Sequence, residues 1–443
     1  MKMRYFLHVL FACWWSQLVV AYDGKVTYEK FYRLNKPTYQ SESGDWIGLS
    51  YKGNPVISKV DTFFEGDFRL YFQDNNSFNY SLQEAYVSYK NADYDLYIGR
   101  KILDWNENEK YWSLGYLNAL QAFTLLSTEE EGVTGIHFNQ RKGDFEYDIL
   151  LSYLFIPQVN PSIDFKHGEV HSKSEWMRLP PTSTVINGTK VPIYYKVKDY
   201  QYSKILLNKS LGFNLKYKYR NGIFSAFAVY KPENKLRVNA EAYYDNVVLN
   251  KVVVEADPTV NHHAYYGIQW SQAFGDVKVK GGLSYVDPNA KLGKDIPIFD
   301  INNSRKTFDS DFFKISPRYD HEAYSHFSAN IFRHKYDLTF NYIHLLSKNI
   351  RGSDDFYSDT VKWKRAVGMG ITYYFNDKFS VLADLKYDLE RFDNIVRGEI
   401  KYNFRNMFNV TLGLEMLKAP NDNSYWSYYR AADTIYSAVG FYF

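Results

Sequence analysis

Charged side chains recur at every second position in four stretches of the chain. These are Lys216, Lys218 and Arg220; Lys278 and Lys280; Asp384 and Lys386; and Arg397, Glu399 and Lys401. Successive side chains of a β-strand point to opposite faces, so each set shares one face. Such a face has to meet water, because an unpaired charge is costly to bury. In a closed sheet with this face inside, these residues would line a pore for ions and small polar solutes.

The charges on these faces are unequal in number. Where the alternation is clearest, eight basic residues stand against four acidic ones, Asp384, Asp388, Glu399 and Glu415. Basic side chains around a pore raise the local concentration of anions, which predicts a slight preference for anions. The alternative is that opposite charges pair across the wall and cancel, as the position of Glu399 between Arg397 and Lys401 would allow.

Residues for catalysis or metal binding do not form a recognisable set. The candidate histidines are His262, His263, His321 and His326. They lack carboxylates at a metal-binding spacing, and we expect them at the rim of the sheet. Ser325 and His326 share one strand, whereas a hydrolase site needs three groups brought together. We therefore expect no enzymatic activity, no cofactor and no metal.

Residues 1–21 predict a cleaved secretory signal peptide. An apolar run of 16 residues, Tyr5 to Val20, follows two basic residues, and the small residue Ala21 precedes the cut. The alternative, a membrane helix, needs about 20 apolar residues. Cleavage removes Cys13, the one cysteine, and leaves 51 basic against 50 acidic residues in 22–443. A net charge this close to zero gives no reason to expect nucleic-acid binding.

Most of the remaining chain alternates with a period of two. In 408–418, for example, Val410, Leu412 and Leu414 are separated by polar or small residues, as in a strand with one apolar face. The segments with this pattern are 26–35, 44–52, 59–73, 78–90, 93–101, 132–140, 144–156, 209–220, 223–231, 236–244, 247–256, 262–274, 277–287, 322–333, 336–347, 362–375, 378–389, 393–404, 408–418 and 435–443. All 13 prolines lie outside these segments, as expected because proline cannot donate to a strand ladder.

Short and long connections alternate between these segments. The short ones are Asn91-Ala92, Arg141 to Gly143, Asn221-Gly222, Asp245-Asn246, Gly275-Asp276, His334-Lys335, Asn376-Asp377 and Arg405 to Met407. The long ones are 102–131, 157–208, 288–321, 348–361 and 419–434. Short periplasmic turns and long extracellular loops are the pattern of outer-membrane barrels.

These features predict an all-β fold: a single transmembrane antiparallel β-barrel of about 18–20 strands over residues 22–443. The aromatic content of 19% fits the aromatic girdles of such a barrel. We expect it in a Gram-negative outer membrane, in contact with lipid and lipopolysaccharide. A soluble sandwich or propeller is the alternative. A propeller would show a repeat of about 40 to 50 residues, which this chain lacks, and a sandwich does not predict alternating connection lengths.

Two of the long loops have predicted roles. Residues 102–131 can start a helix at Asn106. Either the loop folds inward and narrows the lumen, with a constriction formed by Glu107, Glu109, Lys110, Trp112 and the acidic run Glu129 to Glu131, or the helix caps the wall from outside. Loop 157–208 contains five prolines and is expected to shield the barrel, with a hairpin that pairs Thr184-Val185 with Val191 to Tyr195.

The C-terminal strand resembles the assembly signal of bacterial outer-membrane proteins. Phe441 and Phe443 end an alternating run, and the resemblance implies that the barrel-assembly machinery reads the terminal Phe. Gly99-Arg100, followed by Trp105, is similar to a Gly-Arg-x-x-x-x-Trp segment of porin-like families, although Asn106 stands where those families commonly have Gly. This resemblance implies passage of small solutes.

Taken together, the sequence predicts a porin-like channel for passive passage of small hydrophilic solutes. Two alternatives remain: an exit pore for an exported polysaccharide, which would use the same barrel with different loops, and a structural or adhesion barrel with no transport role. The sequence does not decide among them, nor does it decide the oligomeric state.

Deleting Phe443 should lower the amount of folded barrel in outer membranes, because the assembly signal would be lost. The measurement is the heat-modifiable band on a gel of unboiled membranes. A wild-type amount of folded barrel after the deletion would show that the resemblance is accidental.

Overall fold

The structure is a computed structural model. It describes residues 22–35, 43–54, 61–72, 78–122, 128–158, 163–172, 182–186, 188–199, 202–245, 251–288, 290, 311–315, 321–347, 361–404, 407–421, 424–429 and 433–443. The expected signal peptide, 1–21, lies outside these ranges, as does most of loop 288–321.

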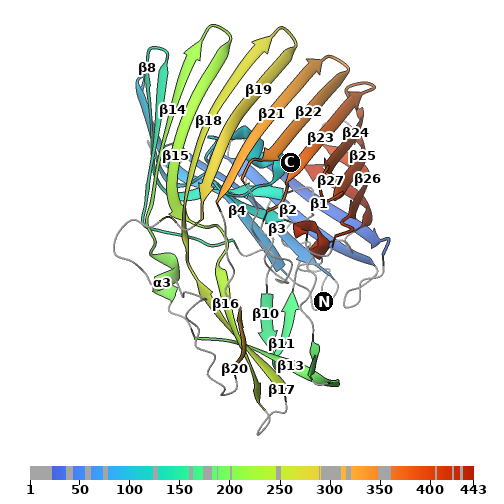
Figure 1. Ribbon diagram of the computed structural model, residues 1–443. Helices are drawn as coiled ribbons and strands as arrows, with labels where there is room; N and C mark the ends of the chain where they lie inside the picture. Colours follow the sequence, from blue (N-terminus) through green and yellow to red (C-terminus); the bar gives the residue numbers. More distant parts are fainter. Residues whose placement is uncertain are drawn as a thin grey trace.

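A closed antiparallel barrel of 18 strands is the main body of the protein (Figure 1). In chain order its strands are β1 (Tyr22–Arg33), β2 (Ser43–Gly53), β3 (Asp61–Tyr71), β4 (Phe78–Lys90), β5 (Tyr94–Lys101), β8 (Val133–Lys142), β9 (Phe145–Ser152), β14 (Ser210–Tyr219), β15 (Gly222–Pro232), β18 (His262–Phe274), β19 (Val277–Asp287), β21 (Glu322–Arg333), β22 (Tyr336–Leu345), β23 (Arg365–Tyr374), β24 (Phe379–Asp388), β25 (Asn394–Phe404), β26 (Phe408–Lys418) and β27 (Thr434–Tyr442). The prediction of an antiparallel barrel of this size is confirmed.

The first and last strands close the barrel. β1 pairs with β27 from Lys25↔Tyr442 to Arg33↔Thr434. Beyond this register, Gly24 and Phe443 exchange backbone hydrogen bonds of 3.1 and 2.9 Å. The ring of Phe443 lies over Gly24 and leaves no room for a Cβ there. The terminal aromatic residue is therefore part of the closing seam.

Two segments predicted as barrel strands lie outside the barrel. β15 pairs directly with β18, and the chain between them forms β16 (Arg237–Asp245) and β17 (Lys251–Thr259). The prediction that 236–244 and 247–256 belong to the wall, with a periplasmic turn at Asp245-Asn246, is therefore wrong. Any sheet with one buried face shows the same alternation, so the pattern does not distinguish the wall from an outer hairpin.

The strands outside the barrel form a separate sheet at one end of it (Figure 1). Its strands are β12 (Ser183–Ile186), β13 (Thr189–Val197), β16, β17 and β20 (Asp311–Ile315). Loop 157–208 also forms a hairpin of β10 (Ile163–Lys166) and β11 (Glu169–Ser172) and the helix α3 (Tyr202–Leu206). The predicted hairpin in this loop is confirmed, since Thr184 pairs with Val191. Six of the other predicted short turns join neighbouring barrel strands at the opposite end: Asn91-Ala92, Arg141 to Gly143, Asn221-Gly222, Gly275-Asp276, His334-Lys335 and Asn376-Asp377. The turn predicted at Arg405 to Met407 lies largely outside the described residues.

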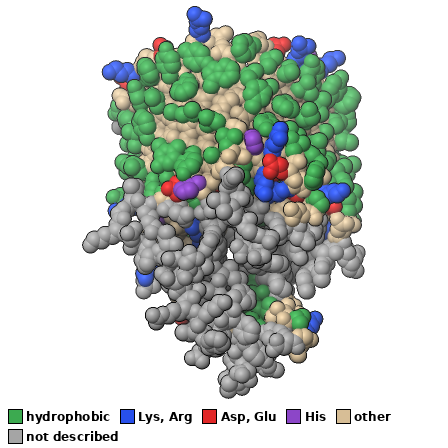
Figure 2. All heavy atoms as spheres, in the orientation of Figure 1, with side chains coloured by type: hydrophobic (Ala, Val, Ile, Leu, Met, Phe, Trp, Pro, Cys, Tyr) green, Lys and Arg blue, Asp and Glu red, His purple; other side chains and the backbone are tan. Residues whose placement is uncertain are grey.

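The outer wall of the barrel is apolar. Figure 2 shows hydrophobic side chains over most of the visible wall, with basic side chains at its upper edge. Large apolar side chains are exposed at alternate positions, for example Ile268, Leu283, Met369 and Leu412. Several exposed phenylalanines lie beside the short turns: Phe274, Phe332, Phe375, Phe404 and Phe408.

Among the described residues, no helix has both the length and the apolar character needed to cross a membrane.

Candidate functional site inside the barrel

The loop between β5 and β8 lies inside the barrel. It contains the helix α2 (Glu107–Trp112) and a hairpin of β6 (Ala119–Ala122) and β7 (Thr128–Glu131). The Asn106 amide donates to the Tyr265 hydroxyl of β18 at 2.6 Å. Gln269 of the same strand donates to the Trp105 carbonyl, also at 2.6 Å. Contacts with wall residues on the barrel's inner face place the loop in the lumen.

Local signals explain where α2 begins and ends. The Asn106 side chain accepts from the Asn108 backbone N–H at 3.1 Å, which is the usual capping of a helix start. Glu107 and Glu109 lie in the first turn, where the helix dipole favours negative charge. Ser113 ends the helix with φ of 53°, the left-handed conformation common at helix ends.

Glu107 faces the predicted lysines of β19. Its carboxylate lies 3.7 Å from the Lys278 ammonium and also forms an ion pair with Lys280. About half of the Glu107 side chain is exposed (51%). The loop thus supplies a carboxylate that pairs with Lys278 and Lys280, which the sequence analysis had placed on the wall without an acidic partner.

The lysines of β14 are also paired. Lys216 lies 3.2 Å from Glu146 and 3.4 Å from Asp148, both on β9, and Lys218 lies 3.2 Å from Glu146. Arg220, predicted to line the pore from the same strand, instead lies in the turn after β14 with φ of 44°. Because the turn starts there, Arg220 is not part of the wall.

The predicted charges of β24 and β25 face the loop or one another. Lys386 is buried, and its ammonium donates to the Tyr111 carbonyl of α2 at 2.6 Å. The Tyr111 hydroxyl lies 3.4 Å from the Asp384 carboxylate. Arg397 donates to Glu399 at 2.8 Å. Lys401 lies opposite Ser380 and Thr411 on the neighbouring strands.

The acidic run at the end of the loop contacts the opposite part of the wall. Glu131 accepts from Arg100 of β5 at 2.9 Å and from Ser81 of β4 at 3.0 Å. Glu130 lies 3.8 Å from Lys110 of α2. Glu130 and Glu131 are both buried, whereas the Lys110 side chain is 67% exposed. Lys110 and Glu107 are therefore the charged side chains that α2 presents to the lumen.

Glu109 and Trp112, predicted at the constriction, do not face the passage. Glu109 is 1% exposed, and Trp112 is fully buried. The Glu109 carboxylate accepts from the Leu117 backbone N–H inside the loop. Burial raises the pKa of the Glu109 carboxyl to about 8, and the charge of Glu130 adds to this effect. The first turn of α2 therefore contributes one residue to the lumen and one to the loop's own interior.

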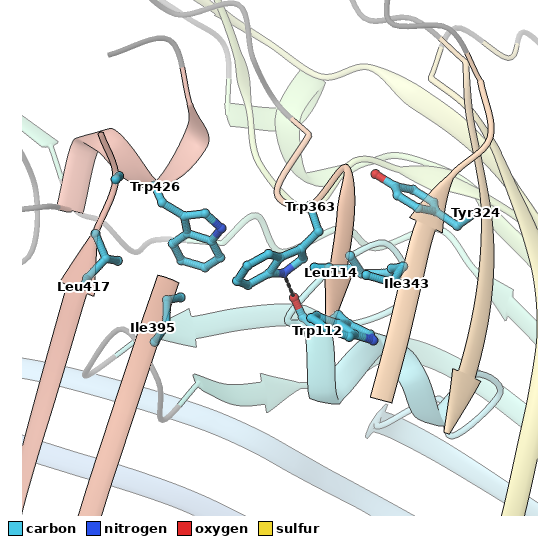
Figure 3. Close-up of a cluster of buried hydrophobic side chains, with 10 residues drawn as sticks. Trp112, Leu114, Tyr324, Ile343, Trp363, Ile395, Leu417 and Trp426 are labelled. Atoms are coloured by element: carbon cyan, nitrogen blue, oxygen red, sulfur yellow. Dashed lines mark hydrogen bonds between the residues drawn. The ribbon is translucent and has the colours of Figure 1, made fainter. Parts of the chain in front are cut away.

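Trp112 belongs to a hydrophobic cluster between the loop and the wall (Figure 3). Its ring lies 5.3 Å from that of Trp363, which lies 5.0 Å from the ring of Trp426. The indole N–H of Trp363 donates to the Trp112 carbonyl at 2.9 Å. Aromatic pairs of this kind add about 0.5–1.5 kcal/mol beyond their buried area, so the cluster fastens the end of α2 to the wall.

Sequence reasoning missed the residues that hold the loop. Lys231 of β15 is 2% exposed, and Lys362 and Trp363 precede β23. One signal was available for Lys231, because it shares its strand face with Phe227 and Val229. A lysine on an otherwise apolar inner face indicates a buried partner. His263 and His326, predicted at the rim, are buried as well.

Within the described ranges, no group of three His, Cys, Asp or Glu side chains could hold a metal ion.

No protein-family model matches the chain, and no curated protein matches it in sequence. Among solved structures, OccK2 (OpdF) of Pseudomonas aeruginosa is similar with a TM-score of 0.48 and 7% identity, over 96% of this chain and 97% of that one. OmpF of Salmonella typhi, in complex with daunomycin, has a TM-score of 0.43 and 11% identity over 96% and 97%. OccAB4 of Acinetobacter baumannii has a TM-score of 0.43 and 10% identity over 95% and 98%.

Replacing Glu109 with Gln should remove a pH dependence from the stability of the loop. The buried carboxyl stays neutral up to its pKa of about 8, but it ionises around its ordinary value of 4.5 once the loop opens. The stability of the closed loop therefore falls as the pH rises between these values, by at most about 1.4 kcal/mol per pH unit. The neutral Gln side chain has no such dependence.

The measurement is the hydrogen-exchange protection of residues 107–117 at pH 5 and pH 8, corrected for intrinsic rates. We expect the protection of Glu109→Gln relative to wild type to increase between the two values. Glu107→Gln is the matched control on the same helix. A constant protection ratio for Glu109→Gln would contradict the prediction.

Proposed function

We propose that the chain is an outer-membrane channel for passive passage of small hydrophilic solutes. One observation carries the proposal: a closed barrel has an apolar outer wall and a charged inner wall, and a loop crosses its lumen. Lipid offers no partners for backbone polar groups, and a closed barrel satisfies them all between its strands. The charged inner wall needs water or partners, which a solvated lumen and the loop provide.

The placement in the outer membrane rests on the two ends of the barrel. Exposed phenylalanines beside the short turns form one aromatic girdle, as expected where a barrel meets a membrane surface. The short turns then face the periplasm, and the outer sheet lies on the extracellular side. Lipid and lipopolysaccharide are the proposed neighbours of the wall, and the barrel-assembly machinery is the proposed partner of Phe443.

The size of the passage follows from the strand number and the loop. Barrels of about 16–18 strands leave an aqueous channel. Here α2 and its flanking residues fill the part of the lumen next to β18–β24. We propose that the part of the lumen left free by α2 passes small solutes.

Any preference for anions should be small. Lys216, Lys218, Lys278 and Lys280 each have a carboxylate within ion-pair distance. The acids are Glu146 on β9 and Glu107 on α2. The sequence-based count of charges included neither of them. We retain the slight anion preference as a proposal. Lys110 is exposed beside the passage, but it too has a carboxylate nearby, that of Glu130 at 3.8 Å.

Purified protein in planar bilayers tests the function. We expect discrete conductance steps, and swelling of liposomes in small sugars that declines as the sugar becomes larger. Swelling in long sugar oligomers would instead favour a polysaccharide exit pore. If the protein shows no conductance, even after deletion of residues 106–130, a structural or adhesion barrel becomes the better reading.

Changing the charges around Glu107 should change ion selectivity in opposite directions. Glu107→Gln leaves Lys278 and Lys280 without their shared acid, so the reversal potential should move toward anion preference. Changing both lysines to Glu should move it toward cation preference. Both shifts should shrink at high salt, because the screening length falls to about 3 Å at 1 M.

Glu169→Gln, on the outer hairpin β10–β11, is the control for loss of one acidic charge far from α2. It should leave the reversal potential close to that of wild type. If the variants at 107, 278 and 280 behave like this control, these residues lie outside the conduction path.

A further inference from the structure

Six consecutive backbone carbonyls of the lumen loop each accept a hydrogen bond from a side chain outside the loop. The residues are 111–116, the end of α2 and the turn that follows it. Tyr111 accepts from Lys386 at 2.6 Å, Trp112 from Trp363 at 2.9 Å, Ser113 and Leu114 from Lys362, Gly115 from Asn234 at 2.6 Å, and Tyr116 from Lys231 at 3.3 Å. We call Lys231, Lys362 and Lys386 the lysine clamp.

For Tyr111 and Trp112 the need for these donors follows from the end of α2, and the carbonyls of residues 113–116 belong to the turn after it. The last four carbonyls of a helix have no partner within the helix, and a buried carbonyl without a partner costs stability. The negative end of the helix dipole also favours cations. Three ammonium groups therefore suit this position better than neutral amides would.

Two of the three lysines of the clamp are withdrawn from the surface. Lys231 and Lys386 are buried, which is rare for lysine unless it is paired. Lys231 also donates to Asn234 at 2.5 Å and to the Pro232 carbonyl at 3.0 Å. Its partners are thus the Tyr116 carbonyl of the loop, Pro232 at the end of β15 and Asn234 just after it. These contacts fix the direction in which the ammonium group points.

Lys362 is itself held in place by a second layer of contacts. The Trp426 indole N–H donates to the Lys362 carbonyl at 2.9 Å, and Arg391 donates to the same carbonyl at 2.5 Å. Arg391 lies 3.4 Å from both Asp388 and Asp393, which are fully buried. The backbone that carries Lys362 is therefore tied to the connection between β24 and β25.

We propose that the lysine clamp positions the constriction: Lys231, Lys362 and Lys386 fix residues 111–116 against the wall, so that the bore is a static filter instead of a gate. The clamp spans donors from β15, from the segment before β23 and from β24, so the loop cannot move as a unit without breaking contacts on several elements. Its effect on transport rests on the proposed function, while its effect on the loop does not.

The test uses a spin label on the exposed side of α2. Lys110 is 67% exposed and outside the clamp, so Lys110→Cys in a Cys13→Ser background gives one labelling site. Clamp variants Lys231→Met, Lys362→Met and Lys386→Met, singly and combined, keep a long apolar side chain but remove the donor. Lys216→Met is the matched control, because Lys216 pairs with acids of the wall and not with the loop.

We expect a single immobilised spectrum for the parent and the control. The clamp variants should show a second, mobile component, largest in the triple variant. In bilayers they should show a larger and noisier single-channel current and admit larger sugars. Heat-modifiable migration on gels verifies that each barrel is folded. If the triple variant fails to fold, Lys386→Met alone removes the side-chain donor to the Tyr111 carbonyl seen among the described residues and decides the question.

Unchanged label mobility and unchanged current in folded clamp variants would overturn the proposal. A protein without any conductance would refute the proposed channel, and the spectra of the same variants would still decide whether the clamp holds the loop. A mobile component in the parent itself would also overturn the proposal, because the loop would then move with the clamp intact.

Discussion

Closure of the sheet is the constraint on which the rest of this structure depends. The pairing of β1 with β27 leaves the barrel no free strand edge, so every strand has two neighbours. Once the register is closed, the alternation of side chains divides the whole chain into an inner and an outer set. The apolar set has to meet lipid or a partner, and the charged set has to find water or counter-charges inside. The closed pairing of the backbone thus decides whether each charged side chain lies on the inner or the outer face of the wall.

A barrel of this width creates a second problem, which the lumen loop solves. Eighteen strands enclose more space than their own side chains can fill, yet the inner wall carries large apolar residues such as Phe227, Tyr265 and Ile343. These residues pack against Trp105, Leu117 and Trp112 of the loop in two hydrophobic clusters. The loop therefore supplies a hydrophobic core between itself and this part of the inner wall.

The sequence predicted the wall well because strand alternation and short turns are local properties. It failed for β16 and β17, whose alternation is equally regular although they belong to the outer sheet. The ion-pair partners of the charged wall residues could not be predicted from the sequence for a related reason. Lys216 and Glu146 lie 70 positions apart, and only the register of β14 with β9 brings them together. The fully buried Glu109 and the exposed Lys110 are adjacent in sequence, so sequence spacing could not separate them either.

The same register explains why a count of basic residues on strands is a poor guide to selectivity. Lys386 is on the inner face, as its alternation with Asp384 indicates, but its ammonium group donates to the Tyr111 carbonyl of the loop. Lys280 is on the inner face too, but it is matched by Glu107. In the proposed channel, a solute would meet the part of each pair that stays exposed, and on α2 these exposed side chains are Lys110 and Glu107. In the proposed channel, ion selectivity would therefore depend less on the total charge of the wall than on how the loop is docked against it, because docking decides which wall charges are covered.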